Sequence, residues 1–138
     1  MKNTKTLQFI FIILVAVVFV GCSNKIVFPN SEVIPAAEAV LKVEENKNNN
    51  YEINLEVEKM AKPDRLTPPR KTYVVWMISE KNGTINLGNL KVSDKNKATL
   101  QTVSPYKPIK VFITAEDTKS ITVPSTQVVL STKQFKVK

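Results

Sequence analysis

Residues 51–58 read YEINLEVE, and this stretch decides the fold class. Ile53, Leu55 and Val57 fall on one side of an extended chain, and the Glu and Asn residues between them fall on the other. Successive side chains of a β-strand point to opposite faces, so the alternation indicates a strand with one buried and one solvated face. Such strands are typical of antiparallel sheets.

Six further stretches have the character of strands. Residues 73–78 (YVVWMI) are apolar on both faces, as in the middle of a sheet. Asn82-Gly83 then predicts a hairpin with a type I′ turn, which needs positive φ at both residues, and Gly88 suggests a bulge in the returning strand at residues 84–87. The remaining strands are expected at residues 37–43, 97–103, 109–116 and 127–137.

These strands predict an all-β fold, a small antiparallel β-sandwich of about seven strands with an immunoglobulin-like arrangement. We expect this domain to occupy residues 36–138. Residues 23–35 lack a clear period and contain Pro29 and Pro35. Residues 22–35 are therefore expected to form a partly extended tether.

The longest loop is expected at residues 61–71, AKPDRLTPPRK, because its three prolines cannot donate to a sheet ladder. Its four basic residues are Lys62, Arg65, Arg70 and Lys71. They form the candidate patch for an anionic partner, either lipid headgroups or an acidic polymer. The alternative is a loop whose charges serve only solubility.

The N-terminus has the pattern of an export signal. Lys2 and Lys5 precede an unbroken apolar run at residues 9–20, which is shorter than the roughly 20 residues that span a bilayer. This suits a signal peptide at residues 1–21 better than a permanent membrane helix. An uncleaved short anchor is the alternative.

The run Phe19-Val20-Gly21-Cys22-Ser23 resembles the lipobox of bacterial lipoproteins, with Phe19 where that family usually has Leu. The resemblance implies cleavage before Cys22 and attachment of a diacylglycerol to its sulfur. The mature protein is then expected on a membrane of the cell envelope, outside the cytoplasm. Ser23 is compatible with transport to an outer membrane where one exists.

Residues 72–130 contain a series of positions with a recognisable order and spacing: Tyr73, Trp76, Ile78, Gly83, Leu87-Gly88, residues 112–116, Pro124 and residues 128–130. In this series the segment resembles the extracytoplasmic C-terminal domain of anti-sigma-K factors. The resemblance implies a small β-sandwich outside the cytoplasmic membrane. The family's sigma-binding region has no counterpart ahead of the apolar run, so sigma binding is not expected.

Composition limits the chemistry that the protein is expected to perform. The chain has 138 residues, no histidine and one cysteine, which argues against zinc clusters, disulfide scaffolds and histidine-based catalysis. Residues 22–61 carry four Lys and seven Glu, a net of −3, whereas residues 62–138 carry 14 Lys and Arg and five acids, a net of +9. We expect no enzymatic activity, no metal and no cofactor. Export argues against nucleic acid as the target of the basic half.

Two functions follow as hypotheses. The first is a non-enzymatic, lipid-anchored envelope protein that serves as a structural or binding module for an envelope protein or an anionic polymer. The alternative is a glycan-binding or small-molecule-binding accessory lipoprotein of an uptake system, which would need an exposed aromatic side chain. Trp76 is expected in the core, and its burial would weaken the glycan hypothesis.

Overall fold

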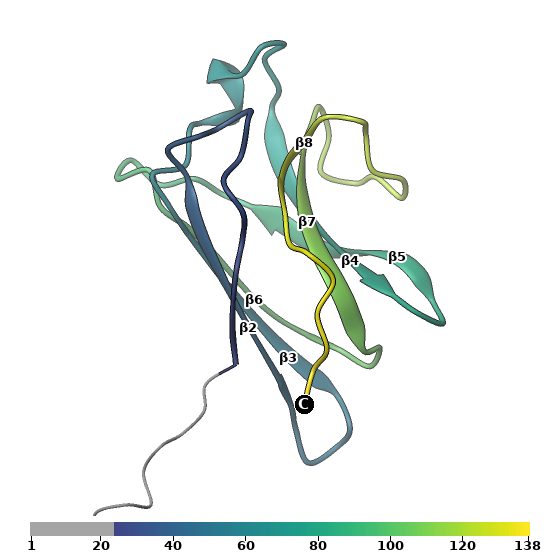
Figure 1. Ribbon diagram of the computed structural model, residues 1–138. Coiled ribbons are helices and arrows are strands. Elements are labelled where there is room, and N and C mark those ends of the chain that lie inside the picture. Colours follow the sequence, from purple (N-terminus) through teal and green to yellow (C-terminus); the bar gives the residue numbers. More distant parts are fainter. Residues whose placement is uncertain (1–23) are drawn as a thin grey trace, which may run out of the picture.

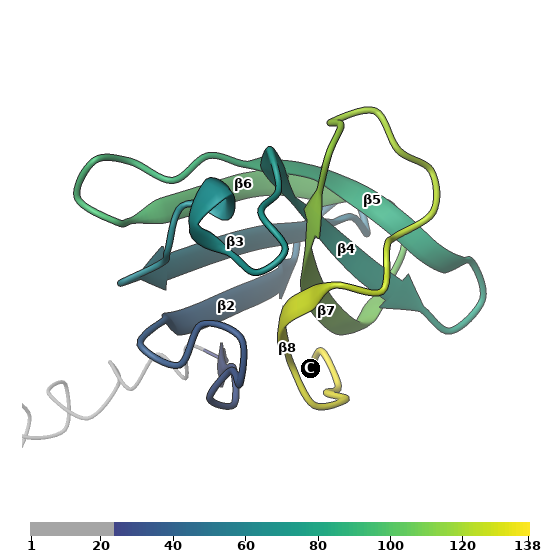
Figure 2. The ribbon, with the colours of Figure 1, turned by 90° about the horizontal axis from the view of Figure 1, so that it is seen from above.

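Eight strands form two antiparallel sheets in the computed structural model, which describes residues 24–138 (Figure 1). One sheet has the order β1-β2-β3-β6 and the other the order β5-β4-β7-β8. Figure 2 shows the two layers from above. The predicted β-sandwich is confirmed, with eight strands rather than about seven. The elements are β1 (Lys25–Val27), β2 (Glu38–Glu45), β3 (Tyr51–Glu58), the 3-10 turn η1 (Pro63–Arg65), β4 (Thr72–Ser79), β5 (Gly83–Leu90), β6 (Ala98–Ser104), β7 (Pro108–Glu116) and β8 (Val128–Ser131).

The core lies between the sheets and follows from the alternation of β2 and β3. Leu41 pairs with Leu55 across these strands, and both side chains are fully buried. In the facing sheet, Val75 of β4 pairs with Ile113 of β7, and both are again buried. The polar side of β3 faces water, where Glu58 forms an ion pair with Lys97. The strand predicted at residues 51–58 is confirmed with its predicted bounds.

The hairpin after β4 forms, but not with the predicted turn type. Gly83 has φ of +68°, whereas Asn82 is not among the residues with positive φ. Glu80, Lys81 and Asn82 therefore make a longer connection, of the kind built around an ordinary turn. The predicted bulge is confirmed, because the register shifts where Val75 pairs with Gly88 and Trp76 with Asn86.

The last strand is shorter than the predicted 127–137. β8 ends at Ser131. At the next residue, the Val111 amide of β7 donates to the Thr132 side-chain hydroxyl at 3.0 Å instead of to a backbone carbonyl, so the regular ladder stops. The chain continues irregularly beside β7, with the Phe135 amide donating to the Ile109 carbonyl at 2.9 Å.

The tether prediction is wrong for residues 25–35. Residues 25–27 form β1, and Phe28 and Ile34 are buried in the main core. The Ser31 hydroxyl donates to the Val129 carbonyl at 2.5 Å and receives the Ile34 amide at 2.9 Å. The sequence does not reveal β1 because a strand of three residues is too short to show an alternating pattern. The sandwich thus includes residues ahead of the predicted boundary at residue 36.

A second apolar cluster covers the outer face of the β5-β4-β7-β8 sheet. Trp76 is fully buried there and stacks on Phe112 with ring centroids 6.4 Å apart. Its indole N–H donates to the Thr114 hydroxyl at 2.8 Å. The loop of residues 117–127 covers the cluster through Ile121, whose carbonyl receives the Asn86 side-chain amide at 2.9 Å. The burial expected of Trp76 is confirmed, but the residue lies outside the space between the sheets.

The strand directions divide the connections between two ends of the sandwich (Figure 1). We call one end the loop end; it carries the connections at residues 28–37, 59–71, 91–97 and 117–127. We call the other the turn end; it carries the connections at residues 46–50, 80–82 and 105–107. β1 runs from the turn end toward the loop end, because it is antiparallel to β2.

Candidate anion-binding pocket

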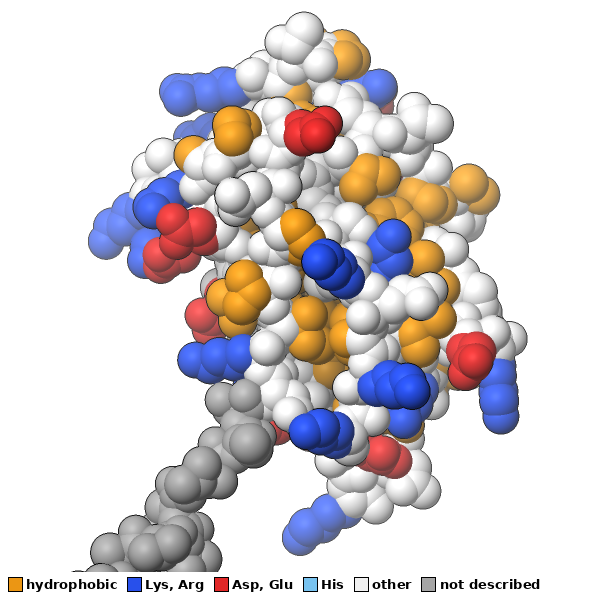
Figure 3. All heavy atoms as spheres, in the orientation of Figure 1, with side chains coloured by type: hydrophobic (Ala, Val, Ile, Leu, Met, Phe, Trp, Pro, Cys, Tyr) orange, Lys and Arg blue, Asp and Glu red, His pale blue; other side chains and the backbone are white. Residues whose placement is uncertain are grey.

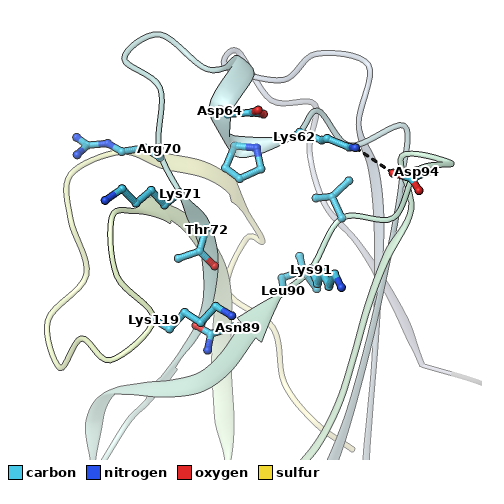
Figure 4. A pocket seen from close by; sticks show the side chains of 12 residues that line it. Lys62, Asp64, Arg70, Lys71, Thr72, Asn89, Leu90, Lys91, Asp94 and Lys119 are labelled. Carbon is cyan, nitrogen blue, oxygen red and sulfur yellow. Dashed lines mark hydrogen bonds and ion pairs between the residues drawn. The ribbon is translucent and has the colours of Figure 1, made fainter.

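A pocket of about 600 Å³ opens at the loop end, where three connections meet (Figure 4). We call it the lysine pocket. Its wall comes from the loop 59–71, the start of β4, the end of β5 and the loops 91–97 and 117–127. It is lined by Lys62, Pro63, Asp64, Arg70, Lys71, Thr72, Asn89, Leu90, Lys91, Val92, Asp94 and Lys119.

The loop 59–71, which supplies part of the pocket wall, is anchored at its buried start. Met60 is fully buried, and its amide donates to the Asn96 carbonyl at 2.8 Å. The Tyr73 hydroxyl donates to the Ala61 carbonyl at 2.9 Å. Burial, with a smaller contribution from the Asp64 carboxylate, raises the pKa of Tyr73 to about 12, so this phenol stays a hydrogen-bond donor at neutral pH.

Arg70 joins two of the loops around the pocket. Its Nη1 lies 2.7 Å from the Asp117 carboxylate, and its Nε donates to the Gln127 side-chain oxygen at 2.6 Å. The Gln127 side-chain amide in turn donates to the Pro68 carbonyl at 3.1 Å. The charge of Arg70 is therefore largely occupied within the protein, and its main effect is to fix the loop that carries Lys119.

The net charge of the lining favours an anion. Five cationic side chains (Lys62, Arg70, Lys71, Lys91 and Lys119) face two carboxylates, Asp64 and Asp94, which leaves +3. Lys62 pairs with Asp94 at 3.0 Å, but that carboxylate is almost wholly exposed, and such surface pairs contribute at most about 1 kcal/mol.

Three lysines of the pocket have no ion-pair partner within residues 24–138: Lys71, Lys91 and Lys119. All three side chains are exposed, and they come from three different segments of the chain. Figure 4 shows them around the rim, with Asn89 beside Lys119. Three cations on one rim suit a multivalent anion, because each can donate to a separate carboxylate or phosphate oxygen.

The structure brings together three of the four residues of the predicted basic patch. Lys62, Arg70 and Lys71 line the lysine pocket, whereas Arg65 lies at a separate hollow beside Ile34 and Leu66. Sequence reasoning missed Lys91 and Lys119, which lie just after the strands at residues 83–90 and 108–116. The predicted lipid-attachment site, Cys22, and the signal peptide lie outside the described residues.

The acidic residues are spread over the surface or engaged in structural contacts. Glu58, Asp94 and Asp117 each pair with a lysine or arginine. Glu116 is buried and accepts hydrogen bonds from the Thr114 hydroxyl at 2.5 Å and the Ser125 amide at 2.8 Å. Residues 24–138 contain no group of three or more His, Cys, Asp or Glu that could hold a metal ion.

No aromatic side chain from residues 24–138 lines the lysine pocket. Trp76 is covered, which weakens the hypothesis of a glycan-stacking site at this residue. Tyr106 is 41% exposed, but it lies at the turn end. The pocket therefore offers charge and hydrogen-bond donors rather than a stacking surface.

No family model, curated protein or solved structure matches this chain. The resemblance to the anti-sigma-K C-terminal domain and to the lipobox thus stays a prediction. In the described part of the chain, the structure contains no helix with the length and hydrophobicity needed to cross a bilayer.

Proposed function

We propose that this protein is a lipid-anchored, non-enzymatic envelope protein whose β-sandwich binds an anionic polymer or acidic protein segment in the lysine pocket. The anchor follows from the lipobox-like run ending at Cys22. The observation that supports the binding role is the convergence of Lys71, Lys91 and Lys119 on one rim, with no ion-pair partner among residues 24–138.

The position of the pocket favours an envelope partner over the headgroups of the anchoring membrane. β1 begins opposite the middle of β2 and runs away from the turn end, so its N-terminal side faces the turn end, and the pocket lies at the loop end. A lipid on Cys22 would hold the sandwich from the turn-end side, so the pocket would face away from that membrane. A carboxylated or phosphorylated polymer, or an acidic protein segment, fits this placement and the pocket's charge.

The anchor is tested by labelling cells with a fatty-acid analogue. We expect the wild-type protein to incorporate the analogue and to remain in the membrane fraction. The Cys22→Ala variant is expected to lose both properties, because its side chain lacks the sulfur that takes the lipid. Equal labelling of the two proteins would refute the anchor.

The pocket is tested with a triple charge reversal, Lys71→Glu, Lys91→Glu and Lys119→Glu. We expect the affinity for oligogalacturonate or polyphosphate to fall at least about tenfold, since each reversal replaces an attraction with a repulsion. The matched control reverses three exposed lysines at the other end, Lys47→Glu, Lys81→Glu and Lys107→Glu, with the same change in net charge. Equal losses in both variants, measured by calorimetry at two salt concentrations, would show nonspecific attraction and contradict the pocket.

A further inference from the structure

The residues between the proposed lipid and the sandwich are too few to separate them. Cys22 lies three residues before Lys25, the first residue of β1. Because an extended chain spans at most about 3.6 Å per residue, the Cys22 Cα lies within roughly 11 Å of the Lys25 Cα. The tether predicted from sequence would have allowed several times this reach. A lipid at Cys22 would therefore keep the body of the protein against the bilayer surface.

The turn end carries the charge that suits such a surface. Its exposed lysines come from the three turns and the C-terminal segment beside β7, and two exposed acids lie among them, Glu45 at the end of β2 and Glu80. Figure 3 shows basic side chains around this end. Anionic headgroups attract such lysines by about 1 kcal/mol each. The lysines are Lys47, Lys81, Lys107, Lys136 and Lys138.

The turn end also presents an aromatic side chain of the kind found at membrane interfaces. Tyr106 is 41% exposed, and its amide donates to the Ser104 hydroxyl at 3.1 Å, which fixes the turn. It shares a hollow of about 400 Å³ with Lys81 and Lys107. Tyrosine flanked by lysines matches the boundary between headgroups and water, where a ring is partly buried and ammonium groups meet phosphates.

The neighbouring face of the sandwich is a poor alternative for this contact. β1 lies at the edge of the sheet that contains β2 and β3, so a short link would also allow the outer face of that sheet to lie on the bilayer. That face carries Glu38, Glu44, Glu52, Glu56 and Glu58 together with two lysines, Lys25 of β1 and Lys42 of β2. Lys59 and Lys97 also pair with Glu38 and Glu58 there, so five acids face four lysines and the face offers headgroups no net attraction, whereas lysines outnumber acids at the turn end.

We propose that the turn end is a membrane-contacting surface, which rests on anionic phospholipid headgroups through its lysines and Tyr106 and leaves the lysine pocket facing away from the bilayer. This inference depends on the proposed lipid anchor. It adds a fixed orientation, which a lipid on a long tether would not impose.

The test places a fluorophore at either end of the full, lipidated chain. Asn82→Cys reports on the turn end and Lys95→Cys on the loop end; both residues are exposed. The proteins are reconstituted into vesicles of equal parts phosphatidylcholine and phosphatidylglycerol that contain a headgroup-linked quencher. We expect loss of fluorescence at position 82 and none at position 95. Equal quenching, or stronger quenching at position 95, would overturn the orientation.

Charge reversal separates electrostatic contact from mere proximity. With Lys81→Glu, Lys107→Glu and Lys136→Glu, the ratio of docked to undocked protein should fall at least about fivefold for each lysine, and quenching at position 82 should disappear. The reversal at Lys71, Lys91 and Lys119 is the matched control and should leave that quenching unchanged. Quenching that survives the turn-end reversal would refute the headgroup contact.

The failure of the anchor and the failure of the orientation give different results. The chain has one cysteine, so the lipidated protein without reporter substitutions should not react with a maleimide. A reactive Cys22 would refute the anchor, and this inference with it. An unreactive, vesicle-bound protein without quenching at position 82 would refute the orientation alone. Protection of position 82 in cells but not in vesicles would identify a protein or polymer at the turn end and overturn the inference.

Discussion

Replacing Trp76 with alanine is expected to lower the free energy of unfolding by about 3–5 kcal/mol. The side chain is fully buried between Phe112 and the loop of residues 117–127. Its loss would leave a cavity and would remove the indole donor from the buried Thr114 hydroxyl. Small domains are commonly stable by about 5–15 kcal/mol, so this variant should show a large shift in its unfolding midpoint.

Two variants make this expectation specific to the Trp76 site. Trp76→Phe keeps most of the apolar area but loses the hydrogen bond to Thr114, so we expect a cost of about 1–2 kcal/mol. Tyr106→Ala removes an aromatic side chain that is 41% exposed and should change stability by less than about 1 kcal/mol. The stability of all three variants is measured by urea unfolding followed by circular dichroism. Tryptophan fluorescence is unsuitable, because Trp76 is the only tryptophan and two of the variants lack it. Equal stability of Trp76→Ala and Tyr106→Ala would contradict the covered cluster.

Trp76 also connects stability to the lysine pocket. The loop that covers it includes Lys119, and Ile121 of that loop packs on the cluster. A folded Trp76→Phe variant should retain the pocket, because the ring still supports Ile121. The outer cluster is therefore part of the support of the candidate site.

The sequence determines strands where the pattern is local. The alternation in residues 51–58 specifies β3 because the polarity of each side chain alone indicates whether it faces the core or the solvent. The apolar run at residues 73–78 similarly specifies a central strand, but it does not reveal that Val74 and Trp76 are covered by a loop rather than by the other sheet. That distinction depends on a contact with Ile121, more than 40 residues away, which has no local signal.

The candidate site could be predicted only in part, for the same reason. The basic residues of the loop 61–71 are close in sequence, so they suggest a patch. Lys91 and Lys119 join them because β5 and β7 both end at the loop end, which follows from strand order and direction. Arg65 is excluded because η1 turns the chain, which places its side chain on another hollow. Membership of the loop 61–71 therefore predicts the residues of the lysine pocket less well than a position at the loop end of the sandwich does.

The boundary between anchor and domain depends on Phe28, which is expected to be essential for stability. Phe28 is 5% exposed, lies in the main core and donates its amide to the Ala39 carbonyl at 3.0 Å. Phe28→Ala should therefore lower the free energy of unfolding by about 3–5 kcal/mol, as expected for a large buried aromatic side chain. If Phe28 lay in a solvated tether, the same substitution would leave the free energy of unfolding almost unchanged.

The neighbouring residue supplies the matched control for this prediction. Val27 is 69% exposed, so Val27→Ala should change stability by no more than about 0.5 kcal/mol. Phe28→Leu keeps much of the buried volume and guards against a variant that does not fold; its expected cost is about 1.5 kcal/mol. If Phe28→Ala and Val27→Ala unfold at the same urea concentration, residues 25–28 do not stabilise the sandwich. The short link to Cys22 would then lengthen, and the orientation proposed for the turn end would lose its geometric basis.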